Sequence, residues 1–314
     1  MTATPKAFAI LGPTASGKTN LALRIAEALP IEIISLDSAL VYRDMDIGTA
    51  KPTTAERQSV PHYLIDIISP LETYSAADFV HDCTRLAEEI HRRGKLPLIV
   101  GGTMMYFHAL TQGLNTLPEA DTDTRAALQA EKKQYGLAYL YGRLKNIDPE
   151  TAARLEPADS QRIERALEVF MLTGKPLSRH FSEQQTYAPP LDLYTLALIP
   201  ENRALLHAQI DKRFLGMVEQ GFLDEVKQLQ ALYPDLNTDL PSMRCVGYRQ
   251  AWEHLEGQYD FDTFIEKGCA ATRQLAKRQL TWLRKIQPEL TLDPYAEEDI
   301  FQTVLNHIRK HFGI

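Results

Sequence analysis

Short apolar runs alternate with longer amphipathic segments in the first third of the chain. The runs cover residues 7–11, 31–36, 63–67 and 96–100, and a fifth run at 193–199 follows much later. This alternation is typical of β-α units, in which parallel strands form a sheet with helices on its faces. We therefore predict an α/β fold built on a parallel sheet flanked by helices.

Helical patterns fill the rest of the chain. A helix is predicted from Ser75, with Asp78 spaced as its capping partner, to about residue 93, where Gly94 is suited to end it. Helical stretches at 123–135 and 160–172 lie in a region without a convincing strand. After Pro200 the pattern is helical to the C-terminus.

These patterns predict two domains. The core is expected at residues 1–114 and 191–314, and an all-α insertion at 115–190. Pro118 on entry and Pro189-Pro190 on exit mark the borders of the insertion, because proline disfavours the continuation of a helix. A chain of 314 residues has room for both parts.

Composition narrows the class of protein. Cys83, Cys245 and Cys269 are widely spaced and odd in number, which argues against a disulfide framework or a zinc site. No apolar run is long enough to span a membrane, and the N-terminus shows no signal-peptide pattern, so we expect a cytoplasmic protein that does not enter a membrane. No obligate protein partner is predicted. The net charge of −7 requires any nucleic-acid site to be a local basic groove.

A phosphate loop follows the first predicted strand. The sequence fits G-x-x-x-x-G-K-[ST] at Gly12, Pro13, Thr14, Ala15, Ser16, Gly17, Lys18 and Thr19, and a helix is predicted to begin near Lys18. Glycines let backbone N–H groups turn towards an anion, the lysine adds a positive charge, and the hydroxyl of Thr19 is suited to bind Mg²⁺. The loop is therefore predicted to bind a di- or triphosphate.

Asp37 lies at the carboxyl end of the second predicted strand. Ligands bind outside this edge of open α/β sheets, so we expect Asp37 to face the same crevice as the phosphate loop. Its carboxylate would serve Mg²⁺ or accept a proton there. The alternative is that Asp37 only caps the following turn, since aspartate is common at such positions.

Several segments together resemble the bacterial tRNA dimethylallyltransferases, also called isopentenyl-tRNA transferases. The resemblance spans nearly the whole chain, without a departure at positions that carry the chemistry of that family. The matching segments are residues 12–19, 37–40, 45–52, 74–79, 101–103, 165–169, 244–250 and 271–279.

The resemblance implies transfer of a dimethylallyl group from dimethylallyl diphosphate to N6 of adenine 37 of tRNA, with Mg²⁺ assisting and diphosphate released. Asp37 would accept the N6 proton, while Thr19 and Arg213 would help to hold the diphosphate. The alternative for Arg213 is that it is an ordinary exposed charge on a helix. The target base must be extruded from the anticodon loop into a pocket. The tRNA-binding residues so implied are Asp37, Ser38, Ala39, Leu40, Thr103, Arg125, Gln161, Arg162, Ile163, Glu164, Arg165, Arg244, Cys245, Val246, Gly247, Tyr248, Arg249, Lys277, Arg278, Gln279, Leu280, Thr281, Trp282, Leu283 and Arg284.

A basic helix near the C-terminus supports the tRNA assignment independently. Glu266 is the only acidic residue close in sequence, and Arg273, Lys277 and Arg284 fall on one flank of the helix, beside an apolar stripe. We expect this flank to contact phosphate, although a solvated helix face gives the same pattern. The cations of the helix are Lys267, Arg273, Lys277, Arg278, Arg284 and Lys285.

Two other functions use the same loop. A small-molecule or nucleotide kinase would hold ATP there and use Asp66, after the third apolar run, near Mg²⁺. A GTPase-type switch is disfavoured because the chain has no N-K-x-D sequence. Residues 104–107 are apolar and follow a buried strand, which is more often core packing than a prenyl pocket, so they remain unassigned.

Overall fold

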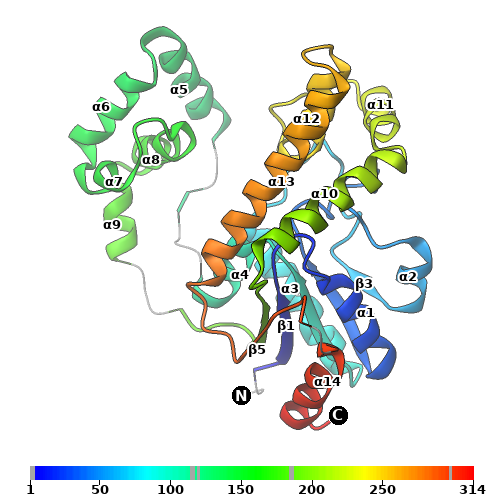
Figure 1. The fold of residues 1–314 in the computed structure, drawn as a ribbon. Helices are drawn as coiled ribbons and strands as arrows, with labels where there is room; N and C mark the ends of the chain where they lie inside the picture. The colour runs from blue at the N-terminus through cyan, green and yellow to red at the C-terminus, as the bar shows by residue number, and fades with distance from the viewer. Residues whose placement is uncertain (1–3, 114–116, 119–120, 184–186, 297–298) are drawn as a thin grey trace. The chain divides into compact units, whose positions relative to one another are not determined.

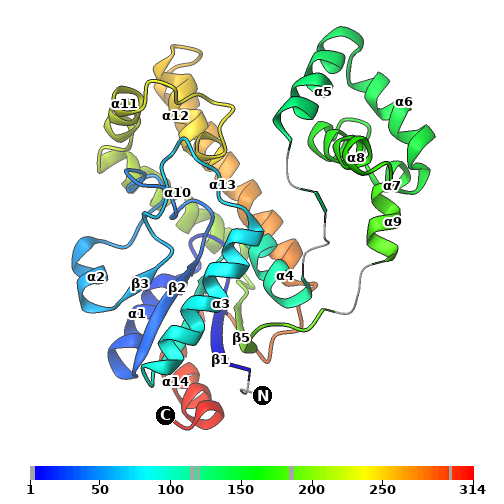
Figure 2. The same ribbon diagram turned by 180° about the vertical axis from the view of Figure 1, so that it is seen from behind.

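The computed structural model describes residues 4–113, 117–118, 121–183, 187–296 and 299–314. The chain forms two compact units (Figures 1 and 2). The larger unit comprises residues 1–111 and 189–314, and the smaller comprises residues 112–188. The smaller unit overlaps the segment in which the insertion was expected.

One parallel sheet forms the centre of the larger unit, with strand order β3-β2-β4-β1-β5-β6. Every residue of β2 and β4 is buried, as expected for strands covered on both faces. The chain leaves the neighbouring strands β1 and β4 towards opposite sides of the sheet, which creates a crevice at their carboxyl ends. The strands are β1 (Lys6–Leu11), β2 (Ile31–Leu36), β3 (His62–Tyr63), β4 (Leu96–Gly101), β5 (Asp192–Leu198) and β6 (Leu290–Leu292).

Helices cover both faces of the sheet. Alternation along β1 sends Phe8 and Ile10 to one face, where α1 and α14 pack, and Leu11 to the other, where α3, α4, α10 and α13 pack. Figure 2 shows α3 running along the sheet. The helices are α1 (Lys18–Ala28), α3 (Ala76–Arg92), α4 (Met104–Gln112), α10 (Arg203–Glu219), α13 (Phe261–Leu283) and α14 (Ile300–Phe312).

A second apolar cluster joins α10 and α13 to two further helices, α11 (Phe222–Leu232) and α12 (Tyr248–Leu255). The rings of Phe214, Phe222 and Tyr248 pack edge to face within it. The short 3₁₀ helix η1 (Ser242–Arg244) leads into α12. This cluster fixes α10 and α13 beside the carboxyl ends of the strands.

All regular structure in the described residues of the smaller unit is helical, and the unit has its own core. Leu128, Leu140, Leu144 and Leu167 are fully buried there. The helices are α5 (Thr122–Tyr135), α6 (Leu137–Ile147), α7 (Pro149–Arg154), α8 (Ser160–Thr173) and α9 (Leu177–Ser182).

The predicted helix at 75–93 is confirmed. Ser75 and Asp78 form a capping box at the start of α3, and Gly94 adopts a positive φ of 72° just after the helix ends. A further capping box, between Thr53 and Glu56, begins the short helix α2 (Thr54–Ser59). Local side-chain chemistry therefore sets these helix ends.

Two predicted elements are wrong. The third apolar run forms a strand only at β3, because Leu64 and Asp66 adopt positive φ values of 61° and 57° that take the chain out of the sheet. The chain after Pro200 is not helical throughout, since β6 adds an edge strand beside β5. A three-residue edge strand is too short to show an alternating pattern.

Candidate active site

The phosphate loop lies between β1 and α1, as the sequence predicts. Ala15 and Gly17 adopt positive φ values of 64° and 74°, which curl the backbone tightly before α1 begins at Lys18. The first N–H groups of a helix lack internal partners and are therefore available to an anion. Tyr295, from beyond β6, donates its hydroxyl to the Ala15 carbonyl at 2.8 Å and holds the loop in this shape.

Two cations and one carboxylate meet beside this loop. Burial and the neighbouring Arg213 guanidinium lower the pKa of Lys18 to about 8, and the Asp37 carboxylate opposes this shift. Burial also lowers the pKa of Arg213, again opposed by Asp37. Protein surrounds most of the Arg213 side chain, but the residue reaches solvent through the cavity that it lines. The lowered pKa values mean that the charged forms of Lys18 and Arg213 are destabilised by burial. A bound anion would stabilise these charged forms.

Asp37 combines the two roles considered for it. Its Oδ1 accepts the Ala39 N–H at 2.9 Å, so the side chain caps the turn after β2, and the residue also lines the cavity that contains Lys18 and Arg213. The Thr103 Oγ1, after β4, accepts the Ser38 N–H at 3.0 Å. The loops that follow β2 and β4 are therefore tied together around the carboxylate.

Gln279 connects the phosphate loop to the loop after β4. Its Oε1 accepts the Thr14 N–H at 2.8 Å, and its Nε2 donates to the Gly102 carbonyl at 2.9 Å. The residue is 9% exposed. A Cβ added at Gly102 would overlap the Gln279 amide and lie 3.0 Å from the Gly12 carbonyl oxygen. Glycine at position 102 therefore leaves the space that the amide occupies.

A cavity of about 550 Å³ joins these groups. Met104, Met105 and Tyr106, which the sequence left unassigned, contribute to its wall, and Met104 and Tyr106 are also buried in the core. A lining that contains both apolar and charged side chains suits a ligand with a hydrocarbon end and a phosphate end. The polar residues of the lining include Thr14, Lys18, Thr19, Asp37, Ser38, Thr103, Arg213, Arg244, Arg278 and Gln279.

The loop at residues 45–52 forms another part of the wall, where Gly48, Thr49 and Ala50 line the cavity. The buried carboxylate of Glu225 accepts the N–H groups of Asp46, Ile47 and Gly48 at 2.9, 2.6 and 3.2 Å. It also accepts the hydroxyl of Tyr248 at 2.6 Å. One side chain of α11 therefore holds the backbone of this loop at three successive residues.

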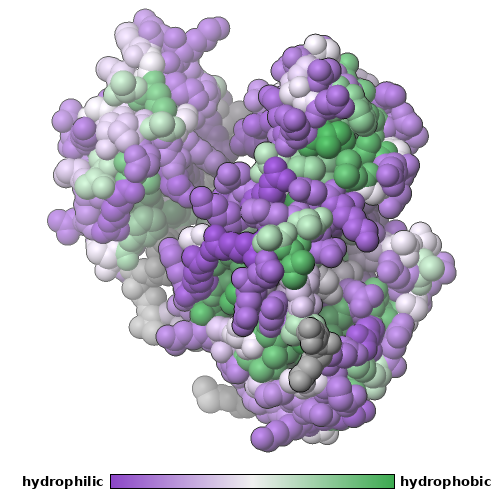
Figure 3. Space-filling view, viewed as in Figure 1, coloured by the Kyte–Doolittle hydropathy of each residue, from purple (hydrophilic) through white to green (hydrophobic). Residues whose placement is uncertain are grey.

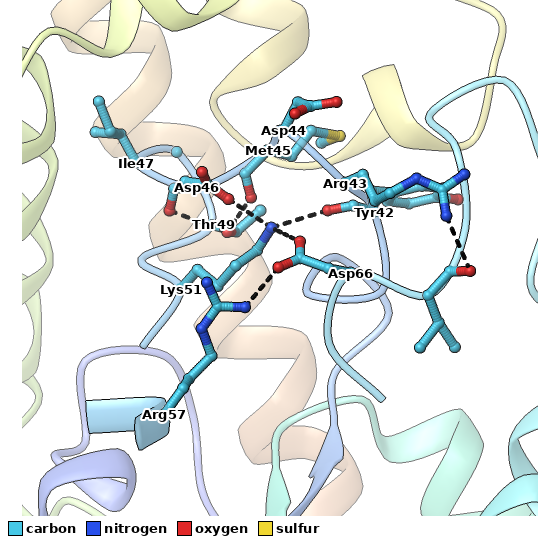
Figure 4. Close-up of polar contacts among 12 residues, drawn as sticks. Tyr42, Arg43, Asp44, Met45, Asp46, Ile47, Thr49, Lys51, Arg57 and Asp66 are labelled. Atoms are coloured by element: carbon cyan, nitrogen blue, oxygen red, sulfur yellow. Dashed lines mark hydrogen bonds and ion pairs between the residues drawn. The ribbon is translucent and has the colours of Figure 1, made fainter. Parts of the chain in front are cut away.

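Lys51 ties the same loop to two other segments (Figure 4). Its ammonium group, on a side chain that is 2% exposed, contacts Asp46 Oδ1 at 2.6 Å, the Tyr42 carbonyl at 2.9 Å and the Asp66 carboxylate. Arg57 contacts the other oxygen of Asp66 at 2.5 Å. Asp66 is thus neutralised by two cations, which is unlike the open carboxylate that a kinase would direct at Mg²⁺.

Comparison with known proteins places these features in a family. Residues 40–286 match the family described as IPP transferase. This chain belongs to that family. Its sequence is 64% identical to the tRNA dimethylallyltransferase of Neisseria meningitidis (serogroup A, strain Z2491) over 99% of each chain. It is 58% identical to the Chromobacterium violaceum protein of the same name, over 91% of this chain and 88% of that one.

Solved structures of the IPP transferase family share the fold. A tRNA isopentenylpyrophosphate transferase from Bacillus halodurans is 38% identical, with a TM-score of 0.68 over 98% of this chain and 96% of that one. A eukaryotic dimethylallyltransferase, captured acting on tRNA, is 28% identical, with a TM-score of 0.77 over 97% of this chain and 77% of that one. The α/β fold predicted from the apolar pattern is thereby confirmed. None of the helices described here is long and apolar enough to cross a membrane.

The implied tRNA-binding residues of the larger unit include cavity-lining, buried and exposed residues. Burial and the Asp37 carboxylate raise the pKa of Cys245 to about 12, so its thiol stays protonated. Tyr248, Leu280 and Leu283 are buried in the apolar clusters, which leaves their side chains no surface for RNA. The cavity-lining members are Asp37, Ser38, Ala39, Leu40, Thr103, Arg244, Cys245, Val246, Arg278, Gln279 and Trp282.

The basic flank of α13 differs from expectation in one residue. Arg273 contacts Asp211 of α10 at 2.6 Å, so its charge is already paired. This acid lies 62 positions away in the sequence and escaped a local charge count. Lys277, Arg278 and Arg284 remain exposed. Figure 3 shows strongly hydrophilic residues over the C-terminal part of α13.

The implied tRNA-binding residues of the smaller unit centre on α5 and α8. Arg125 and Arg165 both contact the buried carboxylate of Glu168, at 2.8 and 2.7 Å. Ile163 is fully buried, whereas Gln161 and Arg162 are exposed. Glu168 therefore orients two arginines whose guanidinium groups are partly accessible.

Four residues that hold other candidate residues or loops in place were not found from the sequence: Lys51, Glu225 and Tyr295 in the larger unit, and Glu168 in the smaller unit. Lys51 and Glu168 lie within segments that match the family, 45–52 and 165–169, so those matches were a usable signal. Glu225 and Tyr295 act on backbone atoms of distant loops, and no residue pattern marks such contacts.

Proposed function

We propose that this chain transfers the dimethylallyl group of dimethylallyl diphosphate to N6 of adenine 37, beside the anticodon of tRNA, and releases diphosphate. The observation that carries the proposal is the meeting of Lys18, Arg213 and Asp37 in one cavity whose lining also contains apolar side chains. Membership of the IPP transferase family and the names of the relatives support it.

Residues 12–19 and Arg213 bind the diphosphate in this proposal. The free N–H groups at the start of α1, the Lys18 ammonium and the Arg213 guanidinium all stabilise the negative charge that develops on the leaving oxygens. The carbon–oxygen bond of the donor breaks, and its electron pair leaves with the diphosphate. Fixed positive groups in a cavity cost little reorganisation as that charge develops.

Asp37 is the base. As the N6 lone pair attacks the allylic carbon, the new carbon–nitrogen bond leaves a proton on nitrogen, and the Asp37 carboxylate accepts it. The Ala39 N–H fixes one oxygen of the carboxylate, so the side chain is oriented before substrate arrives. General-base assistance of this kind contributes about 10² to 10⁴-fold in rate.

Mg²⁺ is the proposed metal, with Thr19 as its ligand from the protein. Thr19 is exposed and lines the cavity, and its side chain carries an oxygen donor of the kind that Mg²⁺ prefers, so the residue fits the ion. When bound, the metal would neutralise charge on the diphosphate oxygens.

The tRNA contacts are assigned to two groups of residues. In the larger unit, Lys277, Arg278 and Arg284 offer exposed charge to the RNA backbone, and Arg244 lines the cavity that receives the base. In the smaller unit, Arg125 and Arg165 present guanidinium groups held by Glu168. Phosphate contacts of this kind position an RNA without reading its sequence.

Mass analysis of digested tRNA tests the proposal. The protein is incubated with dimethylallyl diphosphate, Mg²⁺ and unmodified tRNA, and prenylated adenosine should form without any nucleoside triphosphate. Chelation of Mg²⁺ should stop the reaction. Prenylation that depended on added ATP, or none in the complete mixture, would contradict the proposal.

A further inference from the structure

Tyr295 holds one peptide group of the phosphate loop from outside the loop. Its hydroxyl donates to the Ala15 carbonyl at 2.8 Å. The N–H group of the same peptide belongs to Ser16, and it is donated to the Pro13 carbonyl at 3.3 Å. Both polar ends of the peptide between Ala15 and Ser16 are therefore held, one by the loop itself and one by a distant side chain.

The fold brings Tyr295 to the loop, although 280 positions separate it from Ala15. Strand β6 lies beside β5, and β5 lies beside β1, whose end leads into the loop. Asp293 Oδ1 accepts the Tyr295 N–H at 3.0 Å, which forms a tight turn just after β6. Burial and the Asp293 carboxylate raise the pKa of Tyr295 to about 12, so the hydroxyl keeps the proton that it donates.

Ala15 needs outside support because its backbone lies in the left-handed region, at a φ of 64°. This region is unfavourable for a residue with a Cβ atom, and such conformations persist only where their surroundings hold them. Rotation of the peptide after Ala15 would break both of its hydrogen bonds and change the course of the loop. The Tyr295 hydroxyl opposes that rotation.

The curl of the loop matters because it gathers backbone donors. Four N–H groups at and before the start of α1 have no hydrogen-bond partner among the residues that the structure describes, and such groups are available to an anion. They converge on one anion only while the loop keeps its curl. These groups belong to Ala15, Gly17, Lys18 and Thr19.

We propose that Tyr295 is a positioning residue for the diphosphate, whose hydroxyl keeps Ala15 in its left-handed conformation before the ligand arrives. The proposal rests on the proposed function in taking the diphosphate of the prenyl donor as the ligand of this loop. Tyr295 is not part of the cavity lining, so it acts through Ala15. A ligand that meets a loop already in its binding conformation loses no affinity to ordering it.

Calorimetry of the whole protein with inorganic pyrophosphate, at fixed Mg²⁺, tests the inference. Tyr295→Phe removes the hydroxyl and keeps the ring, which packs against the apolar core. The Kd should rise by about 3- to 10-fold, the net effect of one hydrogen bond. In steady-state kinetics the KM for dimethylallyl diphosphate should rise by the same factor with kcat unchanged, because saturating ligand restores the loop.

Tyr194→Phe is the matched control. The Tyr194 hydroxyl lies 3.0 Å from His307 Nδ1 of α14, so this variant also loses one hydroxyl contact with the C-terminal part of the chain. Tyr194 lies on β5 and is not part of the cavity lining, and its replacement should leave the Kd for pyrophosphate unchanged. An equal rise of the Kd in both variants would overturn the inference, because a general loosening of the C-terminal part would then explain it.

A double-mutant cycle with Ala15→Gly tests the role of the left-handed conformation. Glycine adopts a positive φ without the steric penalty of alanine, so the loop of that variant needs less support. Tyr295→Phe should therefore raise the Kd for pyrophosphate by a smaller factor in the Ala15→Gly protein than in the wild type. An equal factor in both proteins, or an unchanged Kd in folded Tyr295→Phe, would contradict the inference.

The binding assay separates this inference from the proposed function, because pyrophosphate binding requires neither tRNA nor a prenyl group. A protein that fails to prenylate tRNA but shows the effect of Tyr295→Phe on pyrophosphate affinity contradicts the proposed function alone. Normal prenylation by the wild type, with the same pyrophosphate affinity in Tyr295→Phe, contradicts the inference alone.

Discussion

Two lysines of the larger unit show how the same side chain serves opposite purposes. Lys51 is 2% exposed and is held by Asp46, Asp66 and the Tyr42 carbonyl. Lys18 is half-buried where it lines the cavity and forms no ion pair within the described residues, in which its ammonium donates only to the Pro13 carbonyl, at 2.9 Å. A cation with partners stabilises the fold, whereas a cation without them is ready to bind an anion.

The largest expected effect comes from Asp37, whose carboxylate opposes the lowering of the Lys18 pKa. Asp37→Asn keeps an oxygen for the Ala39 N–H but removes the base and its charge. We expect kcat to fall by about 10² to 10⁴-fold. The affinity for pyrophosphate should not fall, because the cavity becomes more positive. Near-normal kcat at saturating substrates would show that Asp37 is only a turn cap.

Lys18→Met should lower kcat/KM for dimethylallyl diphosphate by about 10² to 10³-fold. This is the usual effect of removing one group that stabilises the charge developing in the transition state. Its melting temperature should not fall. Lys51→Met is the matched control: it should lower the free energy of unfolding by about 2 kcal/mol, because buried partners lose their donor, and it should change kcat/KM less. Steady-state kinetics measure kcat/KM, and thermal unfolding measures stability, for each variant. A large loss of kcat/KM in Lys51→Met together with a loss of stability in Lys18→Met would contradict the comparison.

The pKa of Lys18, near 8, predicts a pH dependence of binding. Affinity for pyrophosphate should fall by up to about tenfold per pH unit above 8, as the ammonium loses its proton. The contribution of Lys18 to stability has the opposite sign. Between about 8 and its ordinary value of 10.5 the unfolded chain binds more protons, so this contribution to the free energy of unfolding rises with pH. Lys18→Met should lose both the fall of pyrophosphate affinity and the rise of the free energy of unfolding with pH. If the variant bound pyrophosphate with the same pH dependence as the wild type, a group other than Lys18 would be responsible.

The smallest effect separates paired from unpaired cations on and beside α13. Lys277→Ala and Arg284→Ala should each flatten the plot of log tRNA affinity against log salt by about 0.7 to 0.9. Arg273→Ala should leave the slope unchanged, because Asp211 already neutralises that charge. Filter binding at several salt concentrations measures the slopes, with kcat on a saturating stem-loop as the control. Equal slopes in all three variants would show that the ion pair with Asp211 does not keep Arg273 from contacting the RNA backbone.

The parts of the site that are local in sequence were predictable. The phosphate loop and the end of β2 follow from short patterns, because backbone conformation and strand order place them without help from distant residues. Arg213 looked like an ordinary helix charge, and only the resemblance to a family singled it out. Its place in the cavity depends on how α10 packs, which the sequence of that helix does not contain.

The parts of the fold and of the site that were not predicted involve contacts between residues that are distant in the sequence. The third apolar run predicted a strand, yet Leu64 and Asp66 leave the sheet, and Asp66 is held by Lys51 and Arg57. Arg273 looked free because its partner lies on another helix. In both cases the prediction from the local pattern was wrong, and the structure shows partners that are not adjacent in the sequence.

The hydrogen bond between Thr14 and Gln279 also has a consequence for synthesis on the ribosome. The two residues are 265 positions apart. At about 5 to 20 residues per second, roughly 13 to 53 seconds pass between the emergence of the phosphate loop and that of α13. During that interval β1 and α1 exist without the side chain that closes the loop. The phosphate site therefore matures near the end of translation, although its recognisable motif is among the first residues made.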